Sequence, residues 1–150
     1  MASIPARAIT SYIVIHCSAT RPSMDVGAKE IRQWHLNNGW SDIGYHYVIR
    51  RNGKVEAGRA ENLVGAHEPT RNKNGIGVCL VGGVNQKDFR IAESNYTQEQ
   101  WDALEDLIGN LIAKYPKAKV MGHRDCPGVK KACPSFDAIK WAKSKGFATP

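Results

Sequence analysis

The hydrophobic positions of the chain form two kinds of pattern. Residues 9–16 make an apolar run of strand length, and residues 75–81 make a second run whose composition is typical of a strand buried on both faces. Between residues 97 and 115 the apolar side chains recur every three or four positions, as on one face of a helix. These positions are Trp101, Leu104, Ile108, Leu111, Ile112 and Tyr115.

Capping signals predict where the helices begin. Thr97 and Gln100 have the spacing of a capping box, which predicts the start of the long helix. Asp25 is the predicted N-cap of an earlier helix that stops near residues 38–39, at an Asn-Gly pair. Ser135 is the predicted N-cap of a last helix that is closed by a glycine.

The remaining segments complete an alternation of strands and helices. Residues 45–50 and 54–58 flank an Asn-Gly pair and therefore predict a hairpin. Residues 59–75 have no periodicity and predict a long loop, which in a compact domain is often functional. Residues 119–123 predict a strand that ends at His123. The fold class that follows is α/β, with a central mixed β-sheet flanked by helices.

Length and composition fit a single globular domain. The chain has 150 residues, of which 42% are hydrophobic and 23% are charged, as in an ordinary globular protein. No apolar run approaches the roughly 20 residues that a membrane-spanning helix needs. We therefore expect one domain over residues 1–150, with a core at about residues 9–146 and a short N-terminal extension at residues 1–8.

A formal net charge of +7 favours polyanionic partners. Nucleic acid, an anionic lipid surface and an anionic cell-wall polymer all fit this charge. The basic residues are spread along the chain, so the charge alone identifies no partner. Nucleic-acid binding has only this charge in its support, and we expect no specific nucleic-acid partner.

Two histidines at predicted strand ends and one thiol suggest metal chemistry. His16 ends the first apolar run, His123 ends the last predicted strand, and Cys133 follows ten residues later. Two imidazoles and a thiolate suit a catalytic zinc site whose fourth position is open to water. Lys131 supplies positive charge close to the thiol, where an oxyanion could form. The combination predicts a metal-assisted hydrolase.

Because the N-terminus has no features of an export signal, we do not expect the four cysteines to form a disulfide framework, and we do not expect a structural zinc ribbon either. Their spacing contains no paired CxxC units. Cys79 lies inside an apolar run and is expected to be a small buried side chain. Cys17 follows His16 on the same strand, so we expect it to point to the opposite face and to be inert. Cys126 and Cys133 remain as thiols with a potential function.

Five segments of the chain resemble one enzyme family. IHCSAT, EIRQWH, GYHYVIRRNGKVEAGR, GIGVCLVGG and KACPSFD are similar, in this order, to segments of the zinc-dependent N-acetylmuramoyl-L-alanine amidases. The resemblance runs from about Ile13 to Trp141 and is strongest to the phage lysozymes of the T-seven type. The same fold occurs in the peptidoglycan recognition proteins, so the resemblance implies this fold.

The resemblance also implies an active site. It assigns His16, His123 and Cys133 as the ligands of one Zn²⁺ ion. It assigns Tyr45 to the metal water, either to orient the water or to transfer its proton, and Lys131 to the tetrahedral oxyanion. The implied reaction is hydrolysis of the amide bond between N-acetylmuramic acid and L-alanine in peptidoglycan.

Other polar residues have open interpretations. His67 and Asn72 lie in the predicted loop, where the resemblance implies contacts with the muropeptide; a plain surface position is the alternative. His35 is expected to be structural, and His46 to pack or to support the metal site. Cys126 has no counterpart in the T-seven-type lysozymes, and competition for zinc or pairing with the ligand cysteine are further alternatives.

The resemblance implies a biological role as well. The N-terminus MASIPARAIT has no features of a secretory signal, so we expect a monomeric phage endolysin that is made in the host cytoplasm. A separate holin-type protein would release it to the periplasmic peptidoglycan. T-seven-type lysozymes also bind and inhibit their phage RNA polymerase, which makes this polymerase an implied partner. A non-catalytic wall-binding module is the other alternative, and such modules typically lack the ligand cysteine.

Overall fold

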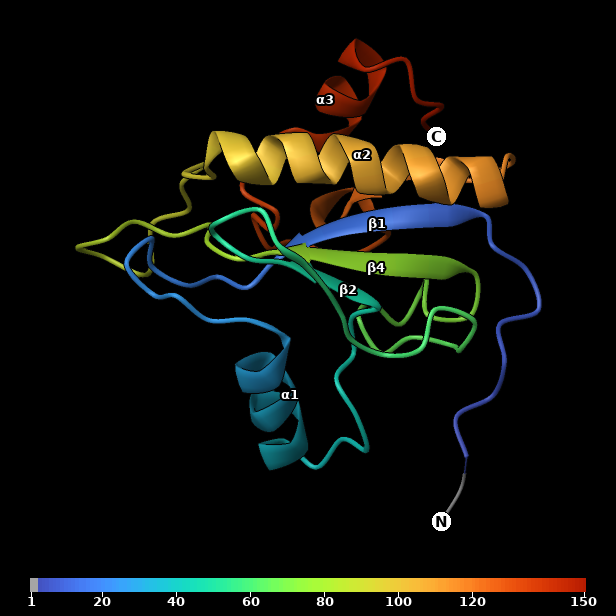
Figure 1. The fold of residues 1–150 in the computed structure, drawn as a ribbon, viewed down its shortest axis with the longest axis horizontal. Coiled ribbons are helices and arrows are strands. Elements are labelled where there is room, and N and C mark those ends of the chain that lie inside the picture. The colour runs from blue at the N-terminus through green and yellow to red at the C-terminus, as the bar shows by residue number, and fades with distance from the viewer. Residues whose placement is uncertain (1–2) are drawn as a thin grey trace.

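The computed structural model describes residues 3–150 and contains one mixed five-stranded sheet (Figure 1). The strand order is β3-β2-β4-β1-β5, in which only β3 runs antiparallel to its neighbour. The predicted α/β fold with a central mixed sheet is confirmed. Residues 1 and 2 of the predicted N-terminal extension lie outside the described residues. The strands are β1 (Tyr12–Cys17), β2 (Tyr47–Ile49), β3 (Val55–Ala57), β4 (Gly75–Leu80) and β5 (Lys119–Gly122).

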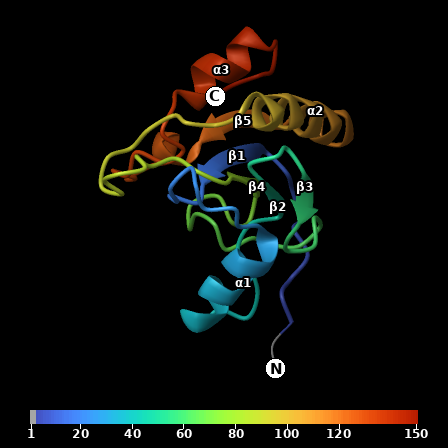
Figure 2. The same ribbon diagram turned by 60° about the vertical axis from the view of Figure 1, so that its left-hand side comes forward.

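Helices lie on both faces of the sheet, as Figures 1 and 2 show. The long helix α2 and the C-terminal helix α3 lie on one side, and α1 lies on the other. Within residues 3–150, no helix combines the length and the apolar composition needed to cross a membrane. The helices are α1 (Ala28–Asn37), α2 (Gln98–Lys114), α3 (Ala138–Ser144) and the single 3-10 turn η1 (His123–Asp125).

The alternation of side chains along β1 separates the core from the polar site. Ile13, Ile15 and Cys17 are buried in the cluster that includes the apolar face of α2. His16 points to the opposite face, because successive side chains of a strand alternate. Ile15 pairs with Gly122 in the parallel ladder, so His16 and the residue after β5 reach the same edge of the sheet.

A buried amide connects α2 to the sheet. The Thr97 side chain accepts from the Gln100 backbone, and the Gln100 side chain accepts from the Thr97 backbone, which confirms the predicted capping box. Gln100 is fully buried, and its Nε2 donates to the carbonyls of Ile49 and Val81 at 3.2 and 2.9 Å. The first turn of α2 is therefore fixed to the ends of β2 and β4.

Replacing Gln100 by alanine should lower the free energy of unfolding by about 2–4 kcal/mol, because it removes buried hydrogen bonds and leaves a cavity. Gln98→Ala is the matched control, since this amide is exposed on the same helical turn. Its effect should stay within about 0.5 kcal/mol. Urea unfolding measures both values, and equal effects of the two substitutions would contradict this account of how α2 is attached.

Two of the predicted helix N-caps are wrong. Gly27 is the N-cap of α1, whereas Asp25 forms an ion pair with Arg50 at 3.1 Å. Asp137 is the N-cap of α3, whereas Ser135 has a φ of 69° and donates its hydroxyl to a carbonyl in the loop after β4. In both cases the side chain that was predicted to cap the helix instead makes a contact with a distant part of the chain.

The other boundaries differ by a few residues. The first strand begins at Tyr12 rather than at Ile9, whose side chain is 62% exposed. The predicted hairpin is confirmed as β2 and β3, with strands shorter than expected. Residues 58–74 contain no helix or strand, so the predicted long loop is also confirmed.

Candidate metal centre

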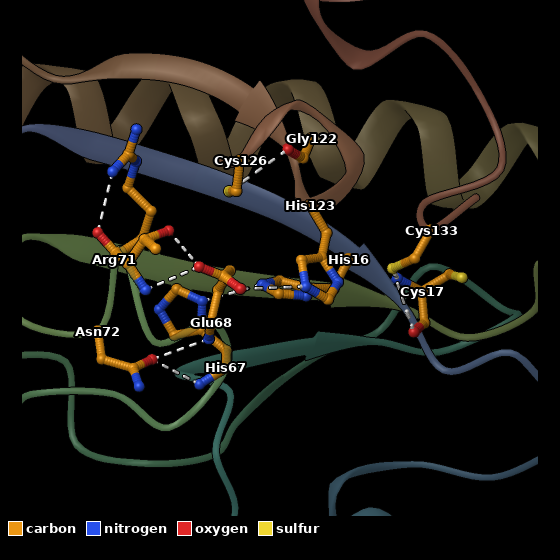
Figure 3. A network of polar contacts seen from close by, with 11 residues as sticks. His16, Cys17, His67, Glu68, Arg71, Asn72, Gly122, His123, Cys126 and Cys133 are labelled. Carbon is orange, nitrogen blue, oxygen red and sulfur yellow. Dashed lines mark hydrogen bonds and ion pairs between the residues drawn. The ribbon is translucent and has the colours of Figure 1, made fainter. Parts of the chain in front are cut away.

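Three side chains from distant parts of the chain meet at the carboxyl edge of the parallel strands (Figure 3). His16 belongs to the end of β1, His123 begins η1 directly after β5, and Cys133 lies in the loop before α3. One donor atom of each lies within 4.8 Å of the other two. Within residues 3–150 this is the only group of three or more His, Cys, Asp or Glu side chains so arranged.

The donor set fits zinc. Zinc bonds of about 2.0–2.3 Å to nitrogen and sulfur place tetrahedral donors roughly 3.5 Å apart, so a spacing within 4.8 Å needs only a small inward adjustment. His16 is 1% exposed, whereas His123 and Cys133 are half-buried. The mixture of imidazole and thiol donors also favours zinc over calcium or magnesium, which prefer oxygen.

Burial keeps the two imidazoles in the form that binds a metal. It lowers the pKa of His16 well below the usual value, and the nearby His67 and His123 lower it further. Burial also lowers the pKa of His123, against the opposing effect of the Glu68 carboxylate. Both rings are therefore neutral near pH 7, with a lone pair available for coordination.

The thiol of Cys133 lies against the end of β1. Its sulfur accepts the backbone N–H of Cys17 at 3.1 Å. A hydrogen bond with the Cys17 thiol and burial raise the pKa of Cys133 well above the usual value. Metal binding must displace this proton, so affinity should increase with pH. Cys17 is buried beneath α2, opposite His16 as predicted, yet it contacts the candidate ligand directly.

Cys126 does not belong to the donor set. It is 3% exposed, packs with Val14 and Met121, and directs its sulfur to the carbonyl of Gly122 at 3.8 Å. Burial raises the pKa of its thiol to about 11. Cys126 is therefore a packed core thiol, and the group that could hold a metal is complete without it.

The two predicted catalytic side chains lie beside the donor set. The ring of Tyr45 packs against that of His16, with 5.1 Å between the centroids. Burial raises the pKa of Tyr45 well above the usual value, so its phenol stays protonated and can donate a hydrogen bond. Lys131 is exposed and borders the same open cavity as His123.

Open cavities flank the donor set on two sides. The larger has a volume of about 450 Å³. A second cavity of about 310 Å³ is bordered by Lys131 and Cys133. Lys131 therefore borders both cavities. The larger cavity is lined by His67, Glu68, Pro69, His123, Gly128, Val129, Lys130 and Lys131.

The loop residues His67 and Asn72 also lie close to the site. His67 is only 8% exposed, so the alternative of a plain surface position is wrong for this residue. Its Nδ1 lies 2.9 Å from Nε2 of His16. Asn72 borders a smaller cavity of about 170 Å³ together with Trp40. Contacts of His67 and Asn72 with a muropeptide stay a prediction.

Sequence reasoning missed Glu68. Its carboxylate is buried and faces Nε2 of His123 at 3.8 Å. Its place in the long loop was the only signal available. The two remaining histidines behave as expected: His35 accepts the Gly44 N–H, and His46 is fully buried beside His67.

Acid should destabilise the metal-free protein through His46 and His67. Burial lowers their pKa to about 4 and about 3, whereas an unfolded histidine titrates near 6.5. Below pH 6.5 the unfolded chain therefore binds protons that the folded chain does not. The free energy of unfolding should fall by up to about 1.4 kcal/mol per pH unit for each histidine until the folded pKa is reached.

Urea unfolding between pH 7 and 5 measures this loss. The variant His46→Gln should be less stable at pH 7 but should show a shallower dependence on pH, because one buried imidazole is gone. Parallel pH curves for the variant and the unsubstituted protein would contradict the assignment.

Comparison with known proteins gives consistent matches. The Amidase_2 family, described as N-acetylmuramoyl-L-alanine amidase, matches residues 6–136. The chain is 49% identical to the endolysin of Enterobacteria phage K11 over 93% of this chain and 90% of the relative. It is 47% identical to the endolysin of Escherichia phage T7 over 95% and 92%. The solved N-acetylmuramoyl-L-alanine amidase LysC from Clostridium intestinale is similar at 28% identity and a TM-score of 0.80, covering 96% and 89%.

Proposed function

Because the chain belongs to the N-acetylmuramoyl-L-alanine amidase family, we propose that it hydrolyses the amide bond between N-acetylmuramic acid and L-alanine in peptidoglycan. The observation that carries this proposal is the convergence of His16, His123 and Cys133 beside Lys131 and an open cavity. A wall-binding module without catalysis needs no such donor set.

The proposed activity depends on one zinc ion held by His16, His123 and Cys133. When bound, zinc supplies Lewis acidity and lowers the pKa of water at its open position. The chain contributes two imidazoles that are already neutral before a metal binds, because burial disfavours their protonation. Cys133 contributes the negative charge once its thiol proton has been displaced.

Lys131 and Tyr45 act on the substrate side of the site. The ammonium group of Lys131 borders the cavity and would stabilise negative charge that develops on the scissile carbonyl oxygen. Tyr45 keeps its phenolic proton because it is buried, and it would donate this proton in a hydrogen bond that orients the attacking water. The contact between its ring and that of His16 supports this role.

Tyr45→Phe should lower kcat by about 10²-fold, because it removes the hydroxyl and keeps the ring against His16. The zinc content should remain at one equivalent. Tyr47→Phe is the matched control, since its hydroxyl donates to Glu61 away from the donor set. Kinetics and elemental analysis on the same samples test this role, and loss of zinc from Tyr45→Phe would indicate a structural role instead.

We further propose that the protein serves as a phage endolysin. Its support is the 47–49% identity to endolysins of phages K11 and T7 over at least 90% of both chains. In this role it would be made in the host cytoplasm and reach the periplasmic peptidoglycan after release by a holin-type protein. Phage RNA polymerase stays a predicted partner without a specific contact to support it.

Digestion of purified Gram-negative peptidoglycan tests the reaction. The zinc-loaded protein should release new N-terminal alanine and no new reducing sugar ends. Reducing ends without alanine would identify a glycosidase and contradict the proposal. Binding to peptidoglycan without any cleavage would favour the wall-binding alternative.

A further inference from the structure

We propose that residues His67 and Glu68, held by Asn72, form an outer layer of the metal centre that orients the two ligand histidines. In Figure 3 these side chains lie to the left of His16 and His123. The inference rests on the proposed zinc site. It assigns to the 58–74 loop a positioning role in metal binding, in addition to any contact with substrate.

A backbone carbonyl determines which nitrogen of His16 carries a proton. Nε2 of His67 lies 3.3 Å from the carbonyl of Gly75, which can only accept, so this nitrogen must be the protonated one. Nδ1 of His67 is therefore an acceptor, and it receives the Nε2 proton of His16 at 2.9 Å. Nδ1 of His16 is left with a free lone pair. The two hydrogen bonds in series therefore leave one defined nitrogen of His16, Nδ1, available to bind a metal.

The ring of His67 occupies a slot that only glycine leaves open. A Cβ atom built on Gly77 would lie 2.6 Å from Cγ of His67, and one on Gly65 would lie 2.5 Å from its Cδ2. Neither glycine has a positive φ, so the reason for glycine is close approach rather than backbone conformation. His46 closes the slot, since its ring packs edge-on at 5.8 Å from that of His67.

Glu68 plays the corresponding part for His123. Its Oε1 faces Nε2 of His123 at 3.8 Å, while Oε2 accepts the backbone N–H of Thr70 at 2.7 Å. The carboxylate is 7% exposed and thus acts on the imidazole with little screening by water. At 3.8 Å the carboxylate makes no direct hydrogen bond, but its negative charge faces Nε2 and favours a proton there, which leaves Nδ1 of His123 as the nitrogen available to a metal.

Asn72 holds both orienting residues in place. Its Oδ1 accepts the backbone N–H groups of His67 and Glu68 at 2.8 and 2.9 Å. One side chain therefore fixes two consecutive residues of a loop that has no helix or strand of its own. These two hydrogen bonds hold the backbone of His67 and Glu68 in place beside the ligand histidines.

Zinc affinity measured by competition with a chromophoric chelator tests the inference independently of hydrolysis. His67→Phe retains a ring but removes the acceptor for His16, and its Kd for zinc should rise 10–100-fold. His67→Asn returns an oxygen acceptor near the position of Nδ1 and should recover most of the affinity. Glu68→Gln should give a smaller loss than His67→Phe, because the contact with His123 is longer.

A second pair of variants alters no polar group. Gly77→Ala should displace the His67 ring and weaken zinc binding by at least about 10-fold. Gly109→Ala is the control, because nothing lies within 4 Å of the added carbon, and its affinity should be unchanged. Thermal unfolding of the metal-free proteins identifies any variant that fails to fold.

The outcomes separate this inference from the function on which it rests. Unsubstituted protein that binds zinc, with folded His67→Phe and Gly77→Ala binding it equally well, overturns the inference alone. If His67→Phe raises the KM for peptidoglycan but leaves the zinc affinity unchanged, the inference is also overturned, and His67 is instead a substrate-binding residue. Unsubstituted protein that binds no zinc overturns the metal-dependent function, and the inference with it.

Discussion

Cys133→Ala should reduce kcat/KM for peptidoglycan hydrolysis by at least about 10³-fold. The variant should lose the metal, and with it the several kcal/mol by which a bound metal stabilises the transition state. Cys133 is the only thiol in the group of three donors. The variant leaves two neutral imidazoles, which bind zinc far more weakly than the complete set. Release of N-terminal alanine and the zinc content of the purified protein measure the two consequences together.

Cys126→Ala is the matched control for this prediction. Its sulfur is buried among apolar side chains outside the donor set, so the variant should keep one equivalent of zinc and its activity. A stability loss of about 1 kcal/mol is expected from the small cavity. Equal loss of activity in the Cys126 and Cys133 variants would contradict the assignment of the thiol ligand.

Lys131→Ala should lower kcat by about 10²–10³-fold with zinc still bound, the size of effect seen when one group that stabilises an oxyanion is removed. The side chain borders both cavities beside the donor set, where the scissile carbonyl would lie. Digestion rates measured on variant and unsubstituted samples of equal zinc content separate this effect from loss of the metal.

Lys130→Ala distinguishes a specific role from general positive charge. Lys130 borders only the larger cavity, so its removal should lower activity by less than about 10-fold. Lys131→Arg retains the charge and should recover part of the rate. Equal losses for the two alanine variants would show that the local charge matters and not the position of Lys131.

The parts of the fold that local pattern determines could be predicted. The apolar run around Ile13 and the periodic helix that begins after Thr97 are set by hydrophobic spacing and by a local cap. The caps at Asp25 and Ser135 were wrong because both side chains make contacts across the fold, with Arg50 and with the loop after β4. Such contacts depend on segments that are distant in sequence.

The candidate site was predictable to a similar degree. His16 and His123 were recognised by their place at strand ends, and the parallel register brings those ends together. The choice of Lys131 over Lys130 came from family resemblance, since spacing alone does not distinguish two adjacent lysines. No local signal separates these lysines before the cavities are known.

The orienting contacts of the outer layer had no signal in the sequence beyond the place of these residues in the long loop. Glu68 approaches His123 only because the loop folds back over the sheet edge. The burial of His67 depends on Gly77 in strand β4, where the absence of a side chain makes room for the ring. A glycine within an apolar run gives no indication of which side chain will fill the space above it.

The central claim is that one zinc ion in this site supports hydrolysis of the muramoyl–alanine bond. Its most direct test is to titrate metal-free protein with zinc and to follow the release of N-terminal alanine from peptidoglycan. We expect the rate to rise linearly and to level off at one equivalent of zinc. Full activity in protein shown by elemental analysis to be free of metal, or no activity at any zinc ratio, would contradict the claim.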